Sequence, residues 1–171
     1  ADGKIRVAGR GWIGSNDDFA LVRYNSDGTL DTSFSGDGML TTAIGASADN
    51  GYSVTVQADG KIVVAGSSYN GSNDDFALAR YNADGMLDTS FETDGKVITN
   101  MGGYDGARDV VLQSDGKIVV AGDFSLTLFD YDAVVLRFLG DSATLRKTPF
   151  DYDGDGKADI SVFRPSDRTW Y

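Results

Sequence analysis

A short acidic segment near the end of the chain holds the residue types best suited to binding chemistry. Its carboxylates stand at positions 1, 3, 5 and 9 of one loop: Asp151, Asp153, Asp155 and Asp159. Four like charges so close together repel one another unless a cation neutralises them, and Ca²⁺ takes roughly six to eight oxygen ligands in such loops. Gly154 and Gly156 permit the tight turn that lets alternate side chains converge. The spacing therefore predicts a calcium site, and an ion-free Asp/Gly surface turn is the simpler alternative.

The composition removes several classes of catalytic site. The 171 residues include no histidine and no cysteine, which excludes a Ser-His-Asp triad, thiolate metal sites and disulfides. The formal charge of -11 disfavours nucleic acids and anionic membranes as partners. No apolar run is long enough to cross a bilayer, so no membrane insertion is expected. The chain opens without methionine and without a signal-like stretch, so we expect a segment excised from a longer protein.

An internal repeat organises the elements that must position this loop. Asp-Gly-Lys-Ile recurs at spacings of 57 and 56 residues, beginning at Asp2, Asp59 and Asp115. The ten residues from Asn16 return almost unchanged from Asn73. A repeat of this length indicates one supersecondary unit per copy.

Strand signals are regular within one copy of the repeat. They predict four strands, separated by turn residues: 52–57, 61–65, 75–81 and 96–99. Asp59 and Gly60 lie between the first two, and an Asp-Gly pair flanked by strand residues predicts a hairpin with a type I′ turn. Repeated units of four antiparallel strands predict an all-β fold built from propeller-type blades.

Differences between the copies predict an incomplete propeller. The apolar run 61–65 suits a strand that is buried on both faces. Arg6 interrupts this run in the first copy, which predicts that the first unit is terminal and exposed. We assign residues 1–140 to partial, full and partial blades, residues 141–149 to a linker, and residues 150–171 to the start of a different module.

The repeated segments resemble the delta-60 repeat of large bacterial surface and secreted proteins. The resemblance covers roughly residues 1 to 140 and rests on three motifs: Asp-Gly-Lys-Ile-Val-Val-Ala-Gly, Asp-Asp-Phe-Ala-Leu-Ala-Arg-Tyr-Asn and Asp-Gly-x-Leu-Asp-Thr-Ser-Phe. It implies a β-propeller of several blades and names no activity.

The segment from Phe150 to Pro165 is similar to the FG-GAP/VCBS repeat, which carries calcium loops. The similarity implies that the ion is bound by the side chains of Asp151, Asp153, Asp155 and Asp159, and by the backbone carbonyl of Lys157. Every side-chain position of that motif is occupied. The chain ends before a full blade of this second type could be completed.

Several other residues are candidates for function. The paired acids Asp17–Asp18 and Asp74–Asp75 could bind a metal, but their repetition favours a structural role such as turn capping. The recurrent Arg23, Arg80 and Arg137 could form ion pairs with them inside each blade. Two aromatic residues at predicted hairpin tips are candidates for carbohydrate or protein contact: Trp12 and Tyr69.

These observations predict a non-enzymatic, extracellular or cell-surface bacterial protein that binds Ca²⁺ and acts as a scaffold or adhesion module. The alternatives are a lectin-like or enzyme-associated propeller whose active residues lie in further blades, and a passive surface spacer. Apolar blade faces at the ends of a three-unit row also predict self-association of the chain.

Overall fold

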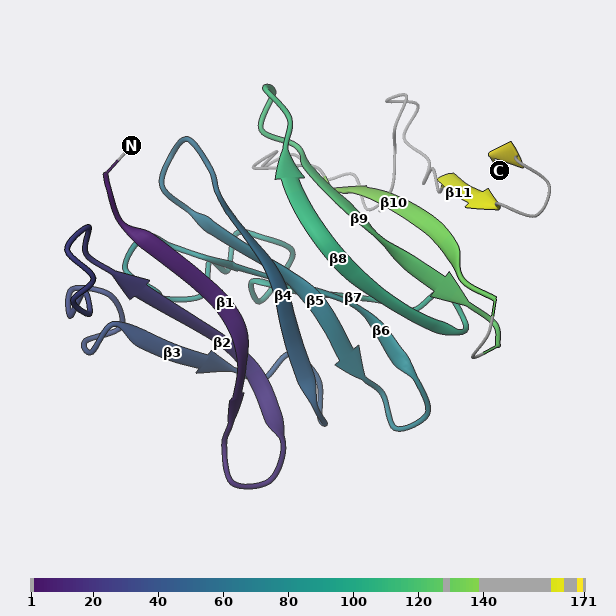
Figure 1. Cartoon of the computed structure of the whole chain (residues 1–171), viewed down its shortest axis with the longest axis horizontal. Helices are drawn as coiled ribbons and strands as arrows, with labels where there is room; N and C mark the ends of the chain where they lie inside the picture. Colours follow the sequence, from purple (N-terminus) through teal and green to yellow (C-terminus); the bar gives the residue numbers. More distant parts are fainter. Residues whose placement is uncertain (1, 128–129, 139–160, 165–168, 171) are drawn as a thin grey trace.

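The fold consists of antiparallel sheets that follow one another along the chain. The computed structural model describes residues 2–127, 130–138, 161–164 and 169–170, and those residues form no helix that could cross a membrane (Figure 1). The middle sheet has four strands in sequential order: β4 (Asp49–Val56), β5 (Ile62–Tyr69), β6 (Asp74–Tyr81) and β7 (Lys96–Thr99). The all-β fold and the four strands of the intact repeat are thereby confirmed.

The two flanking sheets differ from the middle one at their ends. The first sheet has three strands: β1 (Ile5–Trp12), β2 (Asp17–Tyr24) and β3 (Met39–Thr42). The third has five: β8 (Tyr104–Leu112), β9 (Ile118–Ser125), β10 (Asp132–Phe138), β11 (Ser161–Arg164) and β12 (Thr169–Trp170). We call these sheets blades 1, 2 and 3. Strand β11 lies beside β10 as β7 lies beside β6.

Neighbouring blades meet mainly through the first strand of the later blade. Strand β8 contacts β4, β5 and β6 of the preceding blade, and β4 contacts β1 and β2 in the same way. In a β-propeller the blades are arranged around a central axis, and the first strands of successive blades lie close to one another near that axis. We therefore call the β4 and β8 side of the sheets the axis-facing edge. Together the blades form an open, incomplete propeller.

The predicted hairpin between β4 and β5 is present, but its predicted turn type is wrong. A type I′ turn requires positive φ at both central residues, whereas only Gly60, at φ 89°, has it. The Gly60 N–H donates to the Gln57 carbonyl, and the Gln57 N–H donates to the Lys61 carbonyl. This is a three-residue loop that ends on a left-handed glycine. The Asp59 side chain accepts the Lys61 N–H, which confirms its role as a turn former.

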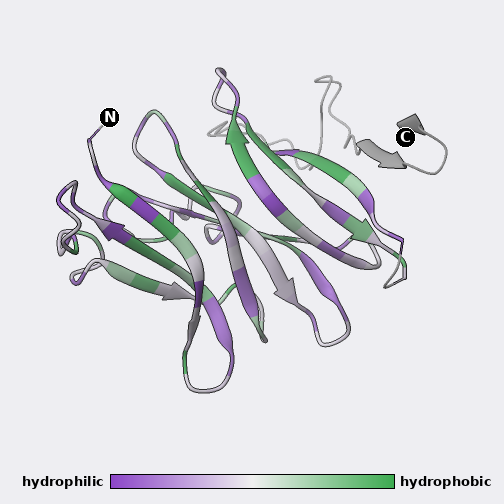
Figure 2. Ribbon diagram, viewed as in Figure 1, coloured by the Kyte–Doolittle hydropathy of each residue, from purple (hydrophilic) through white to green (hydrophobic). Residues whose placement is uncertain are grey.

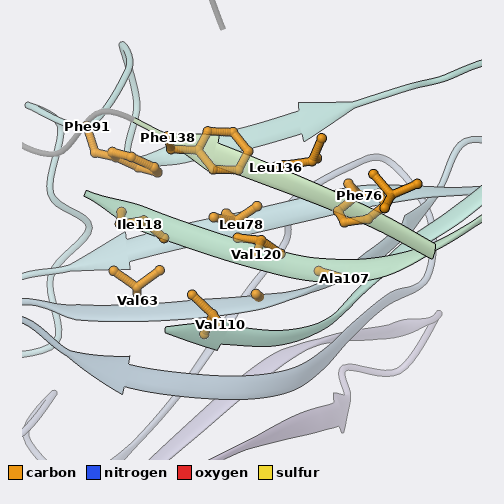
Figure 3. Packing of buried hydrophobic residues seen from close by; sticks show 12 residues of the cluster. Val63, Phe76, Leu78, Phe91, Ala107, Val110, Ile118, Val120, Leu136 and Phe138 are labelled. Carbon is orange, nitrogen blue, oxygen red and sulfur yellow. The ribbon is translucent and has the colours of Figure 1, made fainter. Parts of the chain in front are cut away.

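Each side of the middle blade packs against a neighbour. On β5, Ile62 and Val64 belong to the core between blades 1 and 2, while Val63 and Ala65 belong to the core between blades 2 and 3. All four side chains are fully buried. Figure 3 shows the second of these cores, in which phenylalanines from three repeat positions gather between the sheets. The prediction that this strand is buried on both faces is confirmed.

Blade 1 has an uncovered face, although Arg6 does not mark it. Hydrophobic and hydrophilic residues alternate along β1 (Figure 2). Ile5 and Val7 are 50% and 49% exposed, whereas the Arg6 side chain is only 12% exposed and pairs with Asp2. Because side chains alternate along a strand, Arg6 occupies the position of Val63, on the face turned towards the next blade. The prediction that the first unit is exposed therefore agrees with the structure, but the exposed positions are Ile5 and Val7 on either side of Arg6 rather than Arg6 itself.

Candidate functional site

The predicted calcium ligands lie outside the described residues: Asp151, Asp153, Asp155, Lys157 and Asp159. The structure does describe the backbone of the strand that follows them. Strand β11 begins at Ser161 and pairs antiparallel with β10, with Val162 opposite Val134. The end of the acidic segment is thus only a few residues from a strand of blade 3.

A cationic and acidic network recurs in blades 1 and 2. In blade 2, Arg80 Nε lies 2.7 Å from Asp88 Oδ2, and Lys61 Nζ lies 3.1 Å from the same oxygen. The guanidinium carbon of Arg80 lies 4.6 Å from the centroid of the Phe91 ring, a cation–π distance. The Ser90 hydroxyl donates to Asp88 Oδ1 at 2.7 Å. Blade 1 repeats the network with the corresponding residues: Arg23, Asp31, Lys4, Phe34 and Ser33.

Arg23 and Arg80 pair with Asp31 and Asp88 and not with the acids that precede the third strand, so the predicted partners of these two arginines are wrong. Arg23 lies at the opposite end of β2 from Asp17, too far along an extended strand for an ion pair. The chain instead returns after β2 and brings Asp31 beside Arg23, with 2.7 Å between Nε and Oδ2. The network therefore holds the return segment against its own blade.

Electrostatics support this structural role for Asp88. Burial alone would raise the pKa of its carboxyl, but hydrogen bonds from Ser90 and Lys61 outweigh that effect and lower it to about 2. The pKa of Asp31 is likewise lowered, mainly by hydrogen bonds from Ser33 and Lys4. Both carboxylates are consequently ionised and hydrogen-bonded. This suits groups that hold the return segment in place better than groups that transfer protons.

The paired acids before the third strand secure the neighbouring loops. Asp18 Oδ1 accepts the side-chain amide of Asn16 at 3.0 Å, and Asp75 Oδ2 accepts that of Asn70 at 2.9 Å. Asp105 spans the junction of two blades, since it accepts the Phe76 N–H at 2.7 Å as well as the N–H of Met101. These contacts agree with the structural role predicted for the repeated acids.

The first strands of blades 2 and 3 each contain a β-bulge at the same repeat position. Pairing of β4 with β5 shifts register between Gly51 and Ser53, and pairing of β8 with β9 shifts between Ala107 and Asp109. The extra residues are Tyr52 and Arg108. A bulge redirects its side chain and bends its strand, and bulges are over-represented next to functional sites. The two bulges lie on the axis-facing edge.

The two bulge residues contact each other across the blade junction. The guanidinium carbon of Arg108 lies 5.2 Å from the centroid of the Tyr52 ring. Arg108 also makes a two-point ion pair with Asp123 of β9, at 2.5 Å from Nε to Oδ1 and 3.0 Å from Nη2 to Oδ2. This pairing with Asp123 is the main cause of the raised pKa of Arg108. We call these three residues the bulge cluster.

The repeat-based prediction did not identify the bulge cluster. It treated the first strand as evenly alternating, and it searched for acids or nucleophiles that occur once. The sequence does show that two unlike residues, Tyr52 and Arg108, occupy the same repeat position, because Gly51-Tyr52-Ser53-Val54 corresponds to Ala107-Arg108-Asp109-Val110. That difference could have drawn attention to the cluster. A register shift depends on the partner strand, so the strand's own sequence does not reveal it.

The aromatic residues proposed for the hairpin tips are exposed as predicted. Trp12 ends β1 and is 69% exposed, and Tyr69 ends β5 and is 37% exposed. Neither ring is part of the bulge cluster, which consists of Tyr52, Arg108 and Asp123. They remain separate candidates for surface contact.

Comparison with known families identifies the repeated segments. A family model described as "Domain of unknown function (DUF5122) beta-propeller" matches residues 1–34, 57–91 and 113–143, more than half of the chain. The chain belongs to this family. A search of curated proteins found no match.

The DUF5122 match does not include the two strands of the axis-facing edge, β4 and β8. Its three segments contain β1 and β2, β5 and β6, and β9 and β10, together with Phe34 and Phe91 of the recurrent network. Strands β4 and β8 fall between the segments, so Tyr52 and Arg108 lie outside the DUF5122 pattern, while Asp123 lies inside it. The acidic segment also lies beyond the matched residues.

Proposed function

We propose that the chain is a non-enzymatic, extracellular, calcium-binding segment of a β-propeller that serves as a scaffold or adhesion module. The observation that carries this proposal is the pairing of β11 with β10 directly after the acidic segment. An ion held by that segment would be tied to blade 3 through only a few residues of chain. Calcium binding would then stabilise a strand of the propeller.

The donor set suits a hard cation. The side chains of Asp151, Asp153, Asp155 and Asp159 and the carbonyl of Lys157 supply oxygen ligands only, which favours calcium over thiophilic or imidazole-seeking metals. When bound, Ca²⁺ would neutralise the repulsion among the four carboxylates. The free energy of binding would also favour the state in which β11 is paired.

The repeated polar residues support a non-enzymatic role. Within the described part of the chain, recurring acids such as Asp18, Asp59 and Asp88 accept hydrogen bonds from a loop amide, a turn N–H and a neighbouring serine, respectively. Asp49, for example, accepts the N–H groups of Ile44 and Gly45 between blades 1 and 2. Groups committed to such contacts hold loops and are poorly placed for acid–base chemistry.

The proposed location follows from ion affinity. Extracellular modules bind calcium with dissociation constants on the order of 10⁻⁴–10⁻³ M, a range that matches external calcium and far exceeds cytosolic levels. The acidic charge and the lack of cysteine are compatible with a bacterial surface.

Titration calorimetry on the full chain tests the proposal. We expect Ca²⁺ to bind the native sequence and Asp153→Ala to reduce the affinity at least about tenfold, because one of the four carboxylates is lost. Asp59→Ala is the matched control, since it removes an exposed aspartate of a hairpin turn and leaves the acidic segment intact. Equal heats for the native chain and Asp153→Ala would contradict the calcium site and would leave the spacer alternative in its place.

A further inference from the structure

We propose that the bulge cluster of Tyr52, Arg108 and Asp123 binds an uncharged sugar at the axis-facing edge of the propeller. Tyr52 is 47% exposed and the Arg108 side chain is 57% exposed, although both take part in specific contacts. The site thus combines a ring, a planar donor and a carboxylate that solvent can reach.

The placement of these side chains is a feature of the strands that carry them. Both bulges occur at one position of the repeat, so the backbone presents a side chain to the axis-facing edge in blades 2 and 3. The residues presented differ, however, since one blade supplies an aromatic ring and the next a guanidinium. A bulge that recurs at the same repeat position but carries different side chains is expected where the repeats share one scaffold and particular side chains contact a ligand.

Neighbouring contacts hold the two blades in register at this point. The Ser53 hydroxyl donates to Asp109 Oδ1 at 2.7 Å, and the Val110 N–H donates to the same hydroxyl at 3.3 Å. These bonds join β4 to β8 beside the bulges. The Tyr52 ring and the guanidinium are therefore held together before any ligand arrives, which lowers the entropic cost of binding.

The chemistry of the bulge cluster fits a sugar. A half-exposed tyrosine ring offers an apolar face for the C–H groups of a pyranose, and its hydroxyl offers a hydrogen bond. The guanidinium has five N–H donors, and its bonds to Asp123 use two of them. The carboxylate of Asp123 retains acceptor capacity beside those donors. Adjacent donors and acceptors in one plane match the neighbouring hydroxyl groups of a sugar.

Charge and strand geometry argue against other ligands. Asp123 already neutralises Arg108, Asp74 lies within electrostatic reach of the same guanidinium, and the chain carries a charge of -11. An anionic ligand is therefore repelled. An extended peptide would need a regular strand edge for added backbone hydrogen bonds, and bulges in β4 and β8 interrupt that edge. An uncharged polyhydroxylated ligand is not repelled by the negative charge and does not need a regular strand edge.

An array of immobilised uncharged oligosaccharides, with sulfated and sialylated ones beside them, tests the proposal on the full chain. We expect binding to one or more uncharged members, and weaker binding to charged relatives of the same sugar. Tyr52→Ala and Asp123→Asn are each expected to weaken that binding at least about tenfold, while Tyr52→Phe retains most of it because the ring is kept.

Tyr131→Ala is the matched control, because Tyr131 is also 47% exposed and lies outside the bulge cluster. Thermal unfolding of each variant separates loss of binding from loss of fold. Absence of binding to every uncharged sugar would overturn the proposal, as would equal losses from Tyr52→Ala and Tyr131→Ala. A positive Ca²⁺ titration alongside a silent array would reject this site and leave the calcium proposal standing.

Discussion

Arg80 is the largest fully buried side chain among the described residues. A buried guanidinium is tolerated only when its charge is compensated, and the ion pair with Asp88 and the ring of Phe91 provide that compensation. Arg23 has the same surroundings in blade 1. At the scale of single residues, the same set of a buried arginine, its carboxylate partner and a phenylalanine ring therefore occurs in both blades. The buried arginine depends on the carboxylate and the ring to compensate its charge.

Arg80→Ala tests this dependence. Removal of the guanidinium would leave a buried carboxylate with less compensation, so the free energy of unfolding should fall by about 3–5 kcal/mol. Arg10→Ala should change it by less than about 1 kcal/mol, because the Arg10 side chain is 66% exposed. Urea unfolding of both variants measures the difference. Equal and small losses would show that the network contributes little to stability.

Asp105 gives the clearest pH dependence. Burial is the main cause that raises the pKa of its carboxyl from 3.8 to about 6, and the nearby charges of Asp75 and Asp123 add to the effect. Because the folded chain holds this proton more tightly than the unfolded chain, its contribution to stability is fully present below pH 3.8 and is lost as the pH rises through about 6. Asp88, whose pKa is lowered to about 2, contributes in the opposite direction, and its stabilisation is lost as the pH falls from about 4 towards 2.

Carbon-13 NMR of the side-chain carboxyls measures these pKa values directly. The Asp105 signal should titrate with a midpoint near 6, and the Asp88 signal should still be that of a carboxylate at pH 4. A midpoint near 3.8 for Asp105 would contradict the burial that the structure assigns to it.

At the scale of strands, the sequence pattern of short segments predicted where the strands lie. Alternation and turn residues located every strand of blade 2, because side-chain period and turn chemistry are properties of a short segment. The type of the Asp59 turn was predicted wrongly, because an Asp-Gly pair between strands is compatible with more than one local turn. The partner of Arg23 and the bulge at Tyr52 were missed because each depends on a segment outside the strand that carries the residue.

Three glycines at one repeat position separate these local and nonlocal effects. A Cβ on Gly66 would overlap the Asn50 carbonyl of β4, and one on Gly122 would overlap the Gly106 carbonyl of β8. The same atom on Gly9 would meet nothing within 4 Å, since β1 is the first strand of its sheet. The requirement for glycine thus comes from the neighbouring first strand.

Alanine at these positions should therefore have unequal effects. We expect Gly66→Ala and Gly122→Ala to lower the free energy of unfolding by about 1–3 kcal/mol or more, through collision with the adjacent backbone. Gly9→Ala should lie within about 0.5 kcal/mol of the parent. Thermal or urea unfolding ranks the three variants. A cost at Gly9 as large as that at Gly66 would indicate an intrinsic strand effect and would argue against the role assigned to β4.

At the scale of the whole molecule, the two ends of the row of blades differ. Blade 1 presents Ile5 and Val7, the counterparts of residues that are fully buried between blades 1 and 2. On the outward face of β10, Ala133 and Val135 occupy the positions of the larger Phe76 and Leu78 of β6. Blade 1 therefore offers the more complete apolar face.

This difference predicts which end associates. We expect the chain to self-associate reversibly through the blade 1 face, and Ile5→Lys combined with Val7→Lys to make it monomeric, because charge on that face opposes its burial. Val111→Lys on β8 is the control, since Val111 is 53% exposed on blade 3. Sedimentation velocity over a range of concentrations decides the question. A monodisperse monomer for the parent chain at every concentration would contradict the prediction.

Amide hydrogen exchange of β11 measures the proposed coupling between calcium binding and the propeller. At 10 mM Ca²⁺ and a dissociation constant near the upper end of the extracellular range, exchange of Ser161–Arg164 should slow about tenfold, while β5 remains unchanged as an internal reference. Asp153→Ala should abolish that slowing. Equal exchange rates of β11 with calcium and with a chelator would show that calcium does not stabilise this strand.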